Sequence, residues 1–193
     1  MCIRDSNCDP RLLEDERMIV MQDGYFAEWA DAASLFVYTA AQELATRISH
    51  RNAGVKADCE IAHGIMSRVA RDENHHFIFY RGVASELFDQ DPDAMIQKAN
   101  GVFQNFQMPG TGIPGFNRKA LKMARLGIYN LRIHAENIIE PLLKHWKIDE
   151  LTGLSPEGAK AQEELMAIVP DLIERAEQFE RRQTRRGKVP ATV

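Results

Sequence analysis

The sequence predicts an all-α protein, built as an antiparallel helical bundle. Three observations favour this class. The 193 residues contain no good run of alternating polar and apolar residues, which a half-exposed strand would show. Glycine and proline gather at a few positions and leave long uninterrupted stretches between them. Within those stretches the apolar residues recur at helical spacing, so a bundle of several antiparallel helices is expected.

Three helices are expected in the first half of the chain. The first covers residues 10–22, because Asp9 can cap it and proline is favoured at the first helical position. The second begins near Asp31 and ends at residues 52–54, where asparagine and glycine suit a helix end. The third covers residues 58–88 and stops before an Asp–Pro pair.

Three more helices are expected in the second half. The fourth covers residues 93–106 and ends at a loop rich in glycine and proline, residues 108–115. The fifth covers residues 118–145 and contains Pro141, which should kink it. The last begins at a Ser–Pro pair and reaches a basic stretch at residues 181–188. Positively charged side chains are favourable at the C-terminal end of a helix because of its dipole.

Composition places the protein among cytoplasmic globular chains of one domain. Hydrophobic residues make up 45% and charged residues 27%, which argues against disorder. No apolar stretch approaches the roughly 20 residues that a membrane span needs. A net charge of −4 and a pI near 5.9 argue against nucleic acid as the main partner. Three cysteines form no disulfide framework and fit a reducing compartment.

The two ends of the chain differ from the rest. Residues 1–8 have no periodicity and no capping signal, and no apolar run follows their charges as in a signal peptide. We expect them to be a non-native leader. The folded domain is then expected at residues 9–188, with a short tail at residues 189–193.

Two polar residues interrupt an apolar seam on the third expected helix. The seam alternates spacings of four and three residues: Ala62, Met66, Val69, Glu73, His76, Tyr80, Val83 and Leu87. A buried carboxylate without a partner costs several kcal/mol, so a compensating charge is expected beside Glu73. A Glu-x-x-His pair puts a carboxylate and an imidazole on one helix face, as in dinuclear iron or manganese bundles. A buried ion pair or a hydrogen-bonded core histidine is the alternative interpretation.

Glu43 supplies a second carboxylate, at the centre of the second expected helix. It lies about 30 residues before Glu73, which suits two consecutive antiparallel helices whose midpoints meet. The alternative is a surface glutamate that pairs with Arg47 one turn later. A second Glu-x-x-His pair, Glu60 and His63, lies about 20 Å from Glu73 along the same helix and is interpreted as structural.

Three stretches resemble the soluble acyl-[acyl-carrier-protein] desaturases. They are residues 36–52, residues 72–76 and residues 146–162, and the resemblance extends from about residue 9 to 180. It implies a ferritin-like bundle with a carboxylate-bridged di-iron centre that holds two Fe²⁺ ions. The implied enzyme is an oxidoreductase of fatty acid biosynthesis and lipid metabolism. It uses dioxygen and electrons from ferredoxin to place a cis double bond in an acyl chain carried on acyl carrier protein.

The resemblance also assigns roles to individual residues. Glu43, Glu73 and His76 match iron ligands. Thr46, one turn after Glu43, matches the catalytic threonine on the dioxygen side of the family's centre. Asp72 matches an acidic residue that would orient a ligand histidine from another helix.

The chain departs from the family in its ligand set. The family has an earlier helix with one glutamate and another with a first Glu-x-x-His. Here no histidine precedes His50, and Glu14, Glu16 and Glu28 lack the right partner. Three of six ligands are therefore not found, and we expect a longer natural protein that forms a homodimer when intact. This chain alone is expected to be metal-poor and inactive. The alternative function is a ferritin-like metal-binding protein or a non-catalytic helical bundle.

Overall fold

The computed structural model describes residues 9–23, 29, 31–111 and 114–185, and every regular element within them is a helix. The all-α prediction is therefore confirmed. The elements are α1 (Pro10–Asp23), α2 (Ala32–Lys56), α3 (Glu60–Gln90), α4 (Pro92–Gln104), α5 (Phe116–Arg125), α6 (Leu131–His134), the π-helical turn η1 (Ala135–Ile139), α7 (Glu140–His145), the short 3₁₀ turn η2 (Ile148–Glu150) and α8 (Pro156–Arg185).

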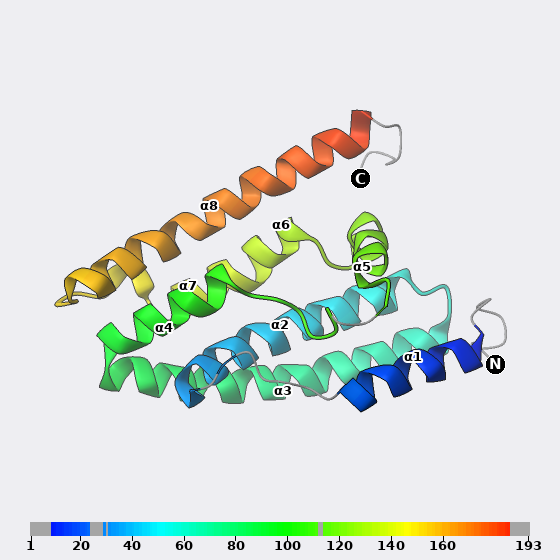
Figure 1. Ribbon diagram of the computed structural model, residues 1–193, viewed down its shortest axis with the longest axis horizontal. Coiled ribbons are helices and arrows are strands. Elements are labelled where there is room, and N and C mark those ends of the chain that lie inside the picture. The colour runs from blue at the N-terminus through cyan, green and yellow to red at the C-terminus, as the bar shows by residue number, and fades with distance from the viewer. Residues whose placement is uncertain (1–8, 24–28, 30, 112–113, 186–193) are drawn as a thin grey trace.

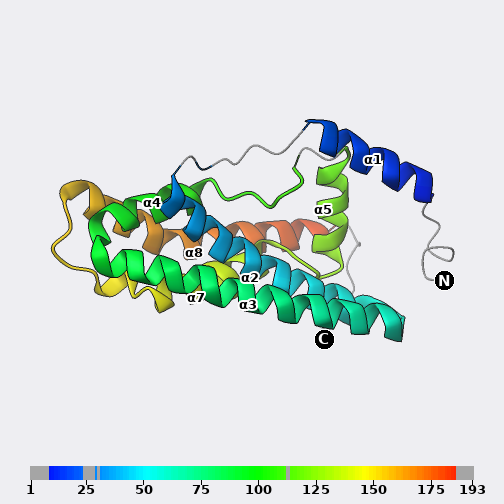
Figure 2. The same cartoon turned by 90° about the horizontal axis from the view of Figure 1, so that it is seen from below.

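The long helices lie in successive layers (Figures 1 and 2). The antiparallel pair α2 and α3 forms one side of the molecule. Helix α4 and the rod formed by α6, η1 and α7 lie in the middle, and α8 packs over them. The core lies between these layers, and its largest fully buried side chains are aliphatic: Ile96, Ile138, Ile139, Leu142, Ile148, Leu165, Val37 and Val102.

Small residues are buried along α2, and one of them, Gly54, lies against α3. Ala40, Ala41 and Ala45 are fully buried on α2. Near the other end of the pair, a Cβ added to Gly54 would lie 2.9 Å from Cβ of Met66 on α3. The expected helix end at residues 52–54 was wrong, because α2 continues to Lys56. Gly54 serves close helix packing, not helix termination.

The fifth expected helix is divided in two. Helix α5 ends at Arg125, and Gly127 adopts a left-handed backbone with φ +68°. Asn130 then caps α6 by accepting a hydrogen bond from the amide of Ile133 at 2.9 Å. The continuous 118–145 helix was therefore wrong. A kink was expected near Pro141. The helix formed by α6, η1 and α7 instead widens into the π-helical turn η1 just before Pro141, which has no N–H to donate.

Side chains fix the remaining helix ends close to the expected positions. Asp31 caps α2 and Asp91 caps α4, each through a 3.0 Å hydrogen bond to a first-turn amide. Asp93 of α4 accepts from the amide and hydroxyl of Ser155 at 2.7 and 2.9 Å, which fixes the start of α8. Helix α1 is tied to α5 by an ion pair between Glu16 and Lys119.

Residues 146–155 connect α7 to α8 and pack against the core. Trp146 lies 5% exposed between the rings of Phe88 and Phe103, with centroid distances of 5.3 and 6.3 Å. Gln162 donates from its side-chain amide to the carbonyl oxygens of Ile148 and Leu151. These contacts bind α8 to the end of the rod.

None of the described helices is long and apolar enough to cross a membrane, as expected from the sequence. The expected leader at residues 1–8 and the tail at residues 189–193 lie outside the described residues.

Candidate metal centre

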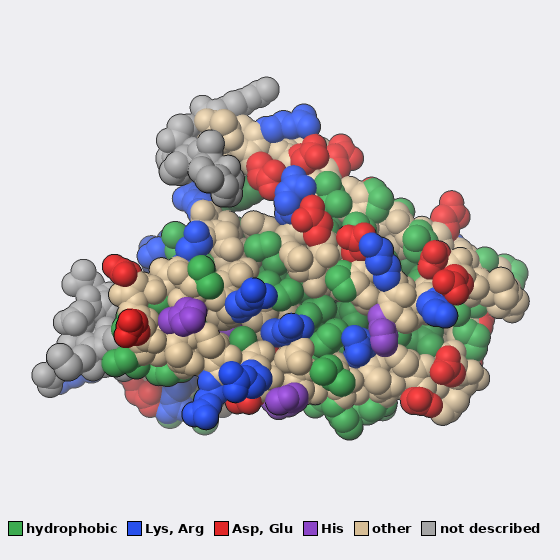
Figure 3. All heavy atoms as spheres, turned by 180° about the vertical axis from the view of Figure 1, so that it is seen from behind, with side chains coloured by type: hydrophobic (Ala, Val, Ile, Leu, Met, Phe, Trp, Pro, Cys, Tyr) green, Lys and Arg blue, Asp and Glu red, His purple; other side chains and the backbone are tan. Residues whose placement is uncertain are grey.

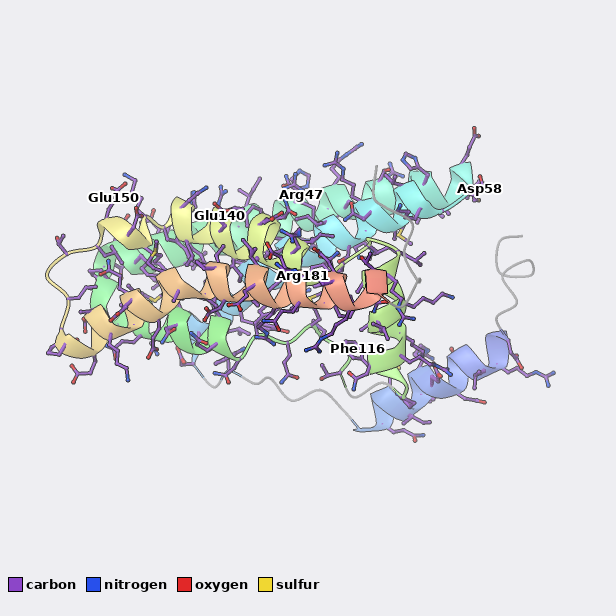
Figure 4. The ribbon with its side chains drawn as sticks, turned by 90° about the horizontal axis from the view of Figure 1, so that it is seen from above. Arg47, Asp58, Phe116, Glu140, Glu150 and Arg181 are labelled. Carbon is purple, nitrogen blue, oxygen red and sulfur yellow. The ribbon has the colours of Figure 1, made fainter. Side chains whose placement is uncertain are left out.

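The midpoints of α2 and α3 meet, and two carboxylates and an imidazole lie where they meet. One ligand atom each from Glu43, Glu73 and His76 lies within 4.8 Å of the others. His76 Nδ1 is 3.3 Å from Glu43 Oε2 and 3.6 Å from Glu73 Oε2. Figure 4 labels Arg47, one turn after Glu43, and Asp58, in the turn that joins the two helices. The three residues predicted as ligands are thus close together.

The cluster lies at the edge of the helix pair. The side chains of Glu43 and Glu73 are 13% and 18% exposed, whereas His76 is 58% exposed. Histidine side chains reach the surface on the face shown in Figure 3, among basic and hydrophobic side chains. The buried residues of α3 are Ala70, Phe77, Ala84 and Phe88. The predicted seam therefore lies beside the buried face, not within it, and His76 is not a core histidine.

Glu43 has an unfavourable environment for a carboxylate. Burial and the neighbouring Glu73 raise its pKa to about 7, and His76 only partly opposes this. Its Oε2 atom accepts no hydrogen bond, although His76 Nδ1 is near. Among the described residues, Arg47 forms no ion pair with Glu43, so the surface-pair alternative is wrong. A cation at this position would compensate both carboxylates.

These residues fit an iron or manganese ion by the chemistry of their donors. Carboxylate oxygens and imidazole nitrogen are the ligands that such ions take in helical bundles. A buried carboxylate oxygen without a donor is the feature that bound metal would satisfy. The set contains three donors, fewer than a dinuclear centre needs, and His76 leaves one side open to solvent.

The two other predicted site residues lie close by. Thr46 is half-buried, and its hydroxyl donates back to the carbonyl oxygens of Gln42 and Glu43 at 3.1 and 3.0 Å. Asp72 precedes Glu73 on α3 and is exposed. Their roles beside a metal stay predictions.

Sequence reasoning missed a fourth residue at the cluster. His50 lies two turns after Glu43 on α2, and its Nε2 is 3.5 Å from Glu73 Oε1. The signal in the sequence was the seven-residue spacing, which puts both side chains on one face of the helix.

The other histidine pairs lie apart from the cluster. Glu60 and His63 are exposed at the start of α3 and join no group of three possible ligands in the described chain. His134 is buried, and its Nδ1 lies 2.7 Å from the hydroxyl of Tyr129. His145 lies 3.2 Å from Ser85 Oγ. The Glu60–His63 pair thus stays outside the cluster, as its structural interpretation expects, and His134 and His145 each contact a neighbouring hydroxyl.

Comparison with known proteins identifies relatives over most of the chain. A family model described as fatty acid desaturase matches residues 3–192. A Mycobacterium tuberculosis protein named as an acyl-[acyl-carrier-protein] desaturase is 38% identical over 182 residues, which cover 89% of this chain and 53% of that protein. The chloroplastic stearoyl-[acyl-carrier-protein] 9-desaturase of Brassica napus is 36% identical, over 80% of this chain and 41% of its own length.

A third relative is named for a different substrate. The chloroplastic palmitoyl-[acyl-carrier-protein] 4-desaturase 3 of Ophrys sphegodes is 35% identical over 146 residues, covering 70% of this chain and 36% of that protein. The chain spans about half the length, or less, of these curated relatives.

Proposed function

The chain belongs to the fatty acid desaturase family, and from that membership and the geometry of its cluster we propose that it forms the metal-ligating half of an acyl-[acyl-carrier-protein] desaturase. The observation that carries this proposal is the approach of Glu43, Glu73 and His76 to within 4.8 Å across two antiparallel helices. The metal would be iron, with two Fe²⁺ ions in the complete centre.

Each residue of the cluster has a distinct task in this proposal. Glu43 and Glu73 would bind the metal from α2 and α3 and lose their mutual repulsion when it is bound. His76 would bind through Nδ1, the atom that faces both carboxylates. Thr46 would face the dioxygen side from the next turn of α2, and Asp72 would orient a histidine ligand from another helix. The bound iron supplies the activation of dioxygen and the abstraction of hydrogen from two neighbouring methylenes.

The remaining ligands would come from outside this chain. On the side of α3 that carries His76, three large apolar side chains are exposed along the length of the helix: Ile61, Ile65 and Phe79. Leaving such side chains in water forfeits roughly 1.5–3 kcal/mol each. This supports the proposal that further polypeptide of the complete protein covers α3 and brings a glutamate and a second Glu-x-x-His.

The substrate and partners follow from the same proposal. We propose that the acyl chain arrives on acyl carrier protein, as the names of the relatives state for them. A ferredoxin-type protein would donate the electrons, and the complete enzyme would be a cytoplasmic homodimer. The proposal includes no nucleic acid partner and no membrane span.

A chimaera tests the proposed function. Residues 9–185 would replace the matched segment of the Mycobacterium tuberculosis relative, and product from acyl carrier protein thioesters would be measured by gas chromatography with dioxygen and reduced ferredoxin. We expect about two irons per chimaera and a desaturated product. Glu73→Ala should abolish both, and Glu60→Ala, in the other Glu-x-x-His pair, should change neither.

Three results would contradict the proposal. A folded chimaera whose activity survives Glu73→Ala would show that the cluster is not the metal centre. A chimaera that binds iron through these residues but forms no product would favour a ferritin-like metal-binding protein, and one without iron would favour a non-catalytic bundle.

A further inference from the structure

His50 contacts the metal-ligating cluster from a position that the proposed centre does not use. Its Nε2 lies 3.5 Å from Glu73 Oε1, while the other oxygen of Glu73, Oε2, lies 3.6 Å from His76 Nδ1. The two oxygens of one carboxylate are therefore divided between two imidazoles, one on each helix.

The arrangement indicates that His50 positions Glu73 and is not itself a metal ligand. The group whose ligand atoms all lie within 4.8 Å contains Glu43, Glu73 and His76, and His50 is not a member. His50 is half-buried and contacts Oε1 of Glu73, the oxygen that the contact with His76 leaves free. It can hold Oε1 of Glu73, but in this geometry it does not share a central ion with the other three.

Holding one oxygen matters because Glu73 is a long, flexible side chain. A carboxylate that rotates freely about its terminal torsion presents either oxygen, or both, to a metal. Partners that orient a ligand from behind typically change metal affinity by 10–100-fold when removed. Glu43 Oε2 has its contact, at 3.3 Å, with His76, which the proposed centre uses as a ligand, whereas Oε1 of Glu73 contacts His50, which that centre does not use.

We propose that His50 is a positioning residue, which holds Oε1 of Glu73 and thereby aims Oε2 at His76 and Glu43. The effect of His50 on metal affinity rests on the proposed function. The effect of His50 on the contact between Glu73 and His76 in the metal-free protein is a separate claim.

The first test uses the metal-free chain. The chain is labelled with ¹⁵N in its histidine rings, and the resonances of His76 are followed by NMR. Glu73→Gln should shift them, as the positive control. His50→Ala should shift them as well, and His50→Gln, which keeps an N–H donor, should restore part of the change. His63→Ala, at an exposed histidine of α3, should leave them in place.

The second test measures Co²⁺ affinity of the same variants anaerobically. His50→Ala should weaken Co²⁺ binding by about 10–100-fold without changing the number of ions bound, and should alter the d–d absorption bands. His63→Ala should do neither. Loss of a bound ion on His50→Ala would instead make His50 a ligand and overturn the positioning role.

The two tests separate the two proposals. If the wild-type chain binds no Co²⁺, the metal centre fails for this chain, and the His76 resonances still decide whether His50 positions Glu73. If Co²⁺ binds but His50→Ala leaves both affinity and His76 resonances unchanged, the positioning role is refuted and the metal centre stands.

Discussion

Acid should destabilise this protein well above the pH at which ordinary exposed carboxylates protonate, because His134 is buried as a neutral ring. His134 is 9% exposed, stacks on Phe106 at 4.9 Å between centroids, and lies 2.7 Å from the hydroxyl of Tyr129. Burial lowers the pKa of His134 from 6.5 to about 4. The unfolded chain therefore binds a proton at this residue between about pH 6.5 and pH 4, and the folded chain does not.

The magnitude follows from that difference in pKa. Each unit corresponds to about 1.4 kcal/mol, so a difference of about 2.5 units lowers the free energy of unfolding by about 3 kcal/mol. The loss begins below pH 6.5 and is complete near pH 4. Total stabilities are about 5–15 kcal/mol, so this single group removes a substantial share.

Urea unfolding at pH 7.5, 5.5 and 4.5 measures the effect. His134→Gln keeps a polar partner for Tyr129 but has no titratable group. We expect it to cost stability at pH 7.5, where the ring contact with Phe106 is lost, and to flatten the fall in stability between pH 6.5 and pH 4. His75→Gln, at an exposed histidine, should keep the wild-type slope. An equal slope in wild type and His134→Gln would refute the reasoning.

Two further changes test the packing and the cluster. Gly158→Ala should lower the free energy of unfolding by about 1–3 kcal/mol, because its Cβ would meet Asp93 Oδ1 at the start of α8. Gly101→Ala, where a Cβ meets open space inside α4, should instead stabilise by about 0.5–1 kcal/mol in the same urea experiment. Glu43→Gln should raise the thermal midpoint of the metal-free chain at pH 8 with chelator, because a buried carboxylate beside Glu73 disappears, and should abolish Co²⁺ binding. A lower midpoint would contradict this.

Helix ends were predictable where a local signal decides them. Asp31 and the Asp–Pro pair before α4 act within one turn of chain, and both cap the expected helices. Gly54 and Gly127 are both glycines but have different structural roles. Gly54 allows α3 to approach α2, whereas Gly127 adopts a left-handed backbone conformation with φ +68°. Only the tertiary arrangement distinguishes these uses.

The candidate site was predictable in part for the same reason. The mid-helix positions of Glu43 and Glu73 follow from helix lengths and an antiparallel turn, both of which the sequence carries. The exposure of His76 and the contact of His50 with Glu73 depend on the rotation of α3 against α2. That rotation depends on packing between distant segments, such as the approach of Gly54 to Met66, whose effect on the angle between helices is not local.

The π-helical turn η1 has a consequence for the helical rod that contains it. His134 and Trp146 are both buried, yet twelve residues along a regular α-helix correspond to roughly 120° of net rotation, which would point them to different sides. The wider turn between them absorbs about one residue's worth of rotation, so that both rings face inward. One extra residue in η1 thus sets the orientation of Trp146 relative to His134. Removing a single residue from η1 would restore the regular helix and keep both rings inward. Converting η1 to a regular helical turn with the same number of residues would instead turn one of the two rings outward, toward solvent.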